Sequence, residues 1–175
     1  MPTPRVFNSY ELHKVDEAVA LAEELVSNYF KMSSAQWLRI RYDVKSGEQL
    51  NQTEMVDGPF AQVVGYDGRK KNACLGSSTF DYYTICLQDW AILEAVGEKN
   101  GIKMFPFLVY IVVHELVHIV RFGQFQQIYA SSSKAEYTMD EEKMVHALTR
   151  KIVSGQSIAG MDKVLEYYQK WVQKE

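Results

Sequence analysis

The sequence predicts an α+β domain, and three observations support this. An amphipathic helical pattern opens the chain, short strand-like segments follow it, and further helical patterns fill the C-terminal half. Helices and strands are therefore grouped along the chain, which is typical of α+β folds and not of repeated βαβ units. The 175 residues are 47% hydrophobic and 23% charged, which suits one domain with its own core. We expect a single domain over residues 1–175.

The N-terminal half predicts one helix and then a small sheet. Residues 9–31 place apolar side chains on one helical face, and Ser9 is the expected cap. Asp67-Gly68 has the composition of a hairpin turn. Strands are expected, in a mostly antiparallel sheet, at residues 36–44, 60–66, 72–76 and 80–88.

The C-terminal half predicts four helices. They are expected over residues 89–98, from Pro106 to about Gly123, from a Thr138–Glu141 capping box to about Val153, and over 161–173. Residues 102–122 are apolar enough to cross a bilayer, but the ionisable groups among them would make that costly. A buried central helix has the same composition, so we expect a core helix and no membrane partner.

Charge and cysteine content exclude several classes of protein. Nineteen basic and 22 acidic residues give a net charge of −3, without the basic excess of a nucleic-acid binder. The two cysteines, Cys74 and Cys86, form no metal-binding pair or secreted disulfide framework. The N-terminus has no apolar stretch typical of a signal peptide. We therefore expect free thiols and a cytoplasmic location.

One motif indicates chemistry. Residues 114–118 read His-Glu-Leu-Val-His, so His114 and His118 lie one helical turn apart on the same face. Two imidazoles in this arrangement can bind one Zn²⁺ ion. Glu115 lies about 100° around the helix, too far to be the natural third ligand but able to reach a metal-bound water. Because buried His and Glu side chains need partners, three of them on one apolar helix predict a shared site.

This motif resembles that of the zincin metallopeptidases, in which a long apolar helix carrying HExxH follows a strand. The resemblance covers about residues 80–153. The metzincin extension HExxHxxGxxH is absent, because Arg121 and Gln124 stand where it has Gly and His. The gluzincin branch, which takes its third ligand from a Glu on the next helix, fits better. The resemblance thus implies a zincin-like fold, with the sheet packed on the HExxH helix and further helices after it.

The resemblance points to Glu142 as the third zinc ligand. Gluzincins carry an ExxxD pattern here, whereas this chain has Glu142-Lys-Met-Val-His146. The replacement of Asp by His leaves open that His146 binds the metal and Glu142 supports it. Glu141 and Glu136 are the remaining candidates.

Other residues near this centre are candidates for supporting roles. Arg121, one turn after His118, could form an ion pair or hold a carboxylate of the substrate. Tyr129 and Tyr137 could each donate a hydrogen bond to an oxyanion. The resemblance implies that an edge strand near 80–88 pairs with an extended peptide or protein substrate.

The function implied is a zinc peptidase in which His114, His118 and Glu142 hold Zn²⁺ and Glu115 is the general base. A second oxyanion stabiliser is expected, with His146, Arg121 and a tyrosine as candidates. One alternative is a zinc-stabilised binding module whose site His146 closes as a fourth ligand. Another is an amide hydrolase like the peptide deformylases, with Cys74 in Asn-Ala-Cys-Leu-Gly as a ligand.

Overall fold

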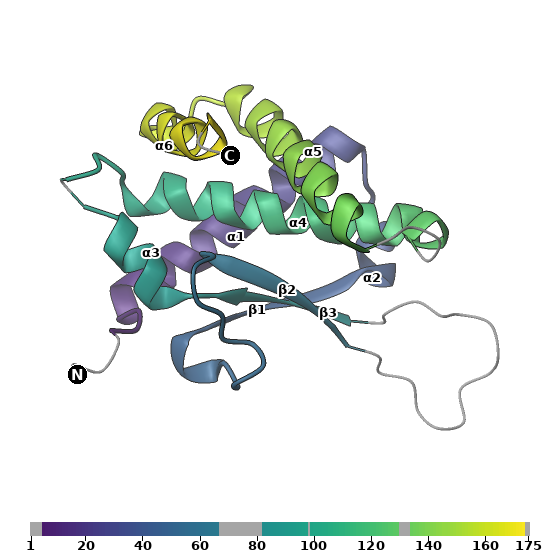
Figure 1. Ribbon diagram of the computed structural model, residues 1–175, viewed down its shortest axis with the longest axis horizontal. Helices are drawn as coiled ribbons and strands as arrows, with labels where there is room; N and C mark the ends of the chain where they lie inside the picture. Colours follow the sequence, from purple (N-terminus) through teal and green to yellow (C-terminus); the bar gives the residue numbers. More distant parts are fainter. Residues whose placement is uncertain (1–4, 67–81, 98, 130–133, 174–175) are drawn as a thin grey trace.

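The computed structural model describes residues 5–66, 82–97, 99–129 and 134–173 (Figure 1). The elements in chain order are α1 (Ser9–Phe30), α2 (Ser34–Arg39), β1 (Arg41–Ser46), the 3₁₀ turn η1 (Gly47–Gln49), β2 (Ala61–Tyr66), β3 (Tyr82–Leu87), α3 (Asp89–Ala95), α4 (Met104–Tyr129), α5 (Lys134–Ser154) and α6 (Met161–Gln173). The predicted α+β class is confirmed. The turn at Asp67-Gly68 and the strand at 72–76 lie outside the described residues.

The three described strands form a mixed sheet with the order β1-β3-β2. β3 pairs parallel with β1 and antiparallel with β2, so that Ile85 lies opposite both Val44 and Val63. The prediction of a mostly antiparallel sheet is corrected in this respect. Parallel neighbours need a long connection, and the segment between β1 and β3, which includes β2, provides one.

The predicted strand at 36–44 is wrong over its first half, where the chain forms α2. Ser33 caps this helix: the side chain of Ser33 accepts a hydrogen bond from the backbone N–H of Gln36 at 3.3 Å. The side chain of Gln36 accepts one in return from the N–H of Ser33 at 2.7 Å. This reciprocal capping box overrides the alternating pattern, and the strand begins only at Arg41.

Helix α4 lies at the centre of the fold. Figure 1 shows the sheet beneath it, α1 behind it and α5 crossing over it, and α4 contacts all of these elements and α6. The segment Met104–Phe122 is long and apolar enough to span a membrane, yet 83% of its most apolar window is buried inside the protein. The predicted core helix is confirmed. Pro106 lies in its first turn, and the helix extends past Gly123 to Tyr129.

Two predicted helix starts are corrected. Asn8, and not Ser9, caps α1, because the side chain of Asn8 accepts a hydrogen bond from the N–H of Glu11. Helix α5 begins at Lys134, so Thr138 lies inside it and the expected capping box does not open the helix. The carboxylate of Glu141 is thereby available for a different contact, described below.

A buried carboxylate, that of Glu54, links the loop before β2 to the sheet by hydrogen bonds and an ion pair. Glu54 is 0% exposed and accepts hydrogen bonds from the backbone N–H of Asn51 at 3.0 Å and the hydroxyl of Tyr66 at 2.6 Å. The ammonium group of Lys45 lies 3.3 Å away. The hydrogen bonds from Asn51 and Tyr66, with Lys45, lower the pKa of Glu54 although burial opposes this.

Replacing Glu54 with Gln is expected to destabilise the fold in a pH-dependent way. Because its pKa is lower in the folded state, ionised Glu54 stabilises the protein above the unfolded value of about 4.3, and this contribution is lost as the pH falls through the folded value. Urea unfolding at neutral pH should show a loss of about 1–3 kcal/mol for Glu54→Gln. That difference should shrink on acidification. The control is Glu24→Gln, the same change at an exposed position of α1. A loss of stability that does not depend on pH, or an equal loss in Glu24→Gln, would contradict the stabilising role of ionised Glu54.

Candidate metal centre

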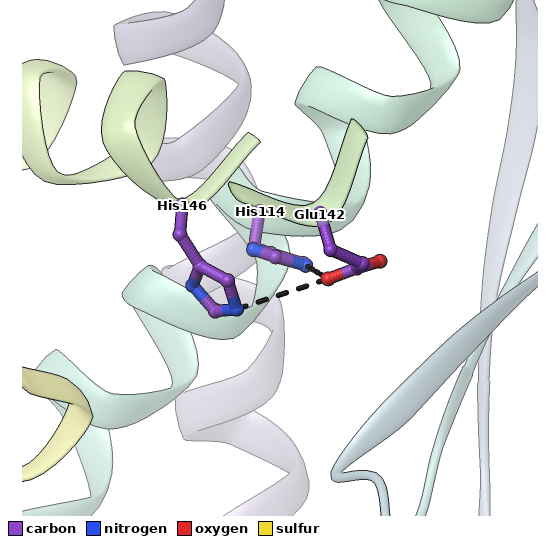
Figure 2. Close-up of side chains that lie close together, drawn as sticks. All are labelled: His114, Glu142 and His146. Carbon is purple, nitrogen blue, oxygen red and sulfur yellow. Dashed lines mark ion pairs between the residues drawn. The ribbon is translucent and has the colours of Figure 1, made fainter. Parts of the chain in front are cut away.

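The crossing of α4 and α5 brings four candidate ligands together. His114 and His118 come from α4, and Glu142 and His146 come from α5. Oε1 of Glu142 lies 2.8 Å from Nε2 of His118, and Oε2 lies 3.4 Å from Nε2 of His114. The carboxylate therefore faces the ligand nitrogens of both motif histidines. Figure 2 shows the ring of His114 and the carboxylate of Glu142 pointing toward one another.

His146 lies beside the same carboxylate, one turn after Glu142. Its Nε2 is 3.8 Å from Oε2 of Glu142, and its Nδ1 is 2.9 Å from the hydroxyl of Tyr110 (Figure 2 shows the first contact). Single ligand atoms of His114, Glu142 and His146 all lie within 4.8 Å of one another. Two overlapping ligand sets thus share His114 and Glu142, and they differ in whether His118 or His146 completes the set.

The donor set fits a zinc ion. Two imidazole nitrogens and one carboxylate oxygen are common zinc ligands, and bonds of 2.0–2.1 Å in a tetrahedron separate neighbouring ligand atoms by about 3.3 Å. The observed 3.4 Å to Oε2 matches this separation, and the 2.8 Å to Oε1, the other oxygen of the same carboxylate, is shorter. Nδ1 of His114 is buried and has no hydrogen-bond partner within the described part of the chain, so Nε2 is its one engaged nitrogen. Burial lowers the pKa of His114, which favours the neutral form that binds metal.

Hydrogen bonds couple Glu142 to both motif histidines. Burial alone would raise the pKa of Glu142, but hydrogen bonds with His114 and His118 lower it. Burial likewise opposes a charge on His118, whereas its hydrogen bond with Glu142 and the charges of Glu115 and Glu142 raise its pKa. The cluster thus stabilises the ionised form of Glu142, the candidate third ligand.

Glu115 borders a cleft of about 1110 Å³ that contains the ligand cluster. Its side chain is nearly buried, and burial raises its pKa to about 7. A carboxylate with such a pKa is suited to accept a proton near neutral pH. The cleft is lined by residues of β2, α4, α5 and α6 and by the loop before β2.

The expected edge strand is corrected: among the three described strands, β3 is the central one, and β2 lies at the edge beside the cleft. The backbone N–H of Gln88 donates to the carbonyl of Phe60 at 2.8 Å. In antiparallel pairing, hydrogen-bonded residues alternate, so the peptide groups of Ala61, Val63 and Gly65 face away from β3. No described strand pairs with this side of β2, so an extended peptide could pair with these groups.

The structure places the other candidates away from the ligand cluster or does not describe them. Arg121 donates two hydrogen bonds to Glu141, from Nε at 2.6 Å and from an Nη atom at 2.9 Å, which links α4 to α5. This bidentate ion pair gives both residues a structural role. The carboxylate of Glu141 therefore faces Arg121 and not the candidate ligands His114 and His118. The side chains of Tyr129, Glu136 and Tyr137, and Cys74 as a whole, lie outside the described residues.

Sequence reasoning missed Tyr110. It lies four residues before His114, on the same face of α4, and that spacing could have indicated it. Its ring stacks on the ring of Tyr168 from α6, with 4.0 Å between the centroids. Burial raises the pKa of Tyr110 and keeps its hydroxyl protonated.

Comparison with protein-family models, with curated proteins and with solved structures found no match to this chain.

Proposed function

We propose that this protein is a zinc-dependent peptidase whose Zn²⁺ is held by His114, His118 and Glu142. One observation carries the proposal: Glu142, 24 residues after His118 and on a different helix, lies against Nε2 of both motif histidines. The HExxH spacing alone leaves two histidines on a helix. The approach of a third ligand of the expected kind supports a catalytic zinc site with three protein ligands.

Glu115 is the general base of the proposed reaction. A bound Zn²⁺ would lower the pKa of a water molecule in its open coordination position and would polarise the carbonyl of the substrate. Glu115 accepts a proton from the water as the water oxygen attacks the carbonyl carbon of the peptide. It then delivers this proton to the amine nitrogen as the C–N bond breaks, which leaves a carboxylate and a free amine.

Two further features support peptide substrates. The outward peptide groups of β2 border the cleft and can hold an extended chain by main-chain hydrogen bonds. His146 lines the same cleft and is the proposed donor to the oxygen that becomes negative during attack. Arg121, a candidate for this task, is engaged by Glu141 instead.

The proposal is tested by incubating the zinc-loaded protein with a broad peptide library and detecting new termini by mass spectrometry. We expect cleavage that a zinc chelator suppresses and that added zinc restores. Absence of cleavage from both the zinc-loaded protein and a chelator-treated, zinc-restored sample would contradict peptidase activity.

A zinc-stabilised binding module is the second candidate, and the position of His146 favours it. With ligand atoms within 4.8 Å of one another, His114, Glu142 and His146 could join His118 in a closed site with four protein ligands. X-ray absorption of the zinc-loaded protein separates the two functions. Four protein ligands would indicate the binding module, and three with an exchangeable water would indicate the peptidase.

A further inference from the structure

The buried hydroxyl of Tyr110 has one hydrogen-bond partner among the described residues, Nδ1 of His146 at 2.9 Å. Tyr110 is only 2% exposed, and its stacking on Tyr168 holds the ring in place. A buried hydroxyl that donates to nothing destabilises the folded protein. If Nδ1 of His146 carried a hydrogen, the O–H of Tyr110 would lack an acceptor. The hydroxyl therefore donates to a bare Nδ1.

This hydrogen bond determines the tautomer of His146. A neutral imidazole has one N–H and one bare nitrogen, so a bare Nδ1 places the hydrogen on Nε2. Nε2 faces Oε2 of Glu142 at 3.8 Å, farther than either motif histidine lies from this carboxylate. An N–H at Nε2 is attracted to the carboxylate oxygen. A bare Nε2 would instead direct its lone pair at a lone pair of that oxygen, and the two would repel. The contacts with Tyr110 and Glu142 thus select the same tautomer.

We propose that Tyr110 is a positioning residue that keeps the Nε2–H of His146 directed into the cleft, as a hydrogen-bond donor and not as a metal ligand. This inference rests on the proposed function. Because a ligating histidine needs a bare nitrogen, the tautomer selected by Tyr110 keeps Nε2 off a zinc ion held by His114, His118 and Glu142. It leaves one coordination position for water and gives the cleft a donor for a developing oxyanion.

The direct test is the tautomer of His146, read from nitrogen chemical shifts in protein with isotope-labelled histidine. The signals of His146 are identified by their loss in His146→Ala. We expect a bare Nδ1 and a protonated Nε2 in the metal-free protein, unchanged after zinc is added. In Tyr110→Phe, which keeps the stacked ring and removes the hydroxyl, we expect this preference to be lost.

A bare Nε2 that shifts on zinc addition would overturn the inference, because His146 would then be a ligand. An unchanged tautomer in Tyr110→Phe would overturn the role of Tyr110. These readouts do not depend on hydrolysis, so the tautomer can be as inferred while peptide cleavage is absent. In that case the proposed function fails and the positioning of His146 stands.

The kinetic test is a double-mutant cycle. Loss of an oxyanion donor lowers kcat by about 100- to 1,000-fold, and this range is expected for His146→Ala. We expect Tyr110→Phe to lower kcat by about tenfold with little change in KM, and to have no further effect in the His146→Ala background. Tyr42→Phe is the matched control, because it removes a partly buried tyrosine hydroxyl that is bonded to Glu23 and does not line the cleft. Independent, multiplying effects of Tyr110→Phe and His146→Ala would overturn the coupling.

Discussion

Glu115→Gln is expected to lower peptide hydrolysis by about 100- to 10,000-fold while zinc stays bound. The side chain keeps its shape but no longer accepts a proton from the attacking water. Since Glu115 is not among the proposed ligands, zinc content measured by mass spectrometry should match that of the wild-type protein. Burial disfavours the charged carboxylate, so the neutral amide should not lower the melting temperature.

The matched control is Glu94→Gln, the same change at an exposed position of α3 outside the cleft. It should leave hydrolysis, zinc content and melting temperature unchanged. Wild-type hydrolysis by Glu115→Gln would remove this residue from the reaction. Loss of zinc from Glu115→Gln would show instead that the carboxylate helps to hold the metal.

Glu142→Ala is expected to weaken zinc binding by more than about 100-fold. Loss of an outer partner of a zinc ligand already costs about 10- to 100-fold in affinity, and loss of a ligand itself should cost more. The remaining site would be two histidines on one helix, without an anionic ligand. Competition with a chromophoric chelator measures the change, and hydrolysis at limiting zinc should fall with it.

Asp140→Ala provides the control, because it removes an exposed acidic side chain from the same helix two residues earlier. His146→Ala separates the two ligand sets. If zinc affinity falls as far in His146→Ala as in Glu142→Ala, His146 is a ligand. If Glu142→Ala retains wild-type affinity and Cys74→Ser loses it, the deformylase-like site replaces the one proposed.

The part of the site on one helix could be predicted in detail. His114, Glu115 and His118 are related by helical spacing, which is the same in any α-helix. The burial of this helix was also predicted from composition, because an apolar segment interrupted by ionisable groups suits a helix covered by other elements. For the third ligand, the sequence leaves four candidates, which are Glu136, Glu141, Glu142 and His146. Glu141 and Glu142 are adjacent in sequence but about 100° apart around α5, and the two face Arg121 and the motif histidines respectively.

The errors in the predicted fold also come from contacts that a local sequence pattern does not encode. The alternation of residues 36–44 suits a strand, but the capping of α2 by Ser33 and Gln36 depends on side-chain geometry that alternation does not encode. The strand at 80–88 was identified as a strand but misplaced as an edge. Its place in the sheet depends on which strands pair with it, and those lie up to about 40 residues away in sequence.

The sequence by itself determined that this protein is an α+β chain with a buried helix carrying two histidines and a glutamate in metal-binding and general-base spacing. Helical periodicity and hydrophobic burial are local properties, so the order of residues is enough to establish them. Only the tertiary structure decided that Glu142 faces both histidines, that Arg121 engages Glu141, that β2 borders the cleft and that Tyr110 holds His146. Each of these contacts joins different elements, and their meeting depends on how α4, α5 and the sheet pack together.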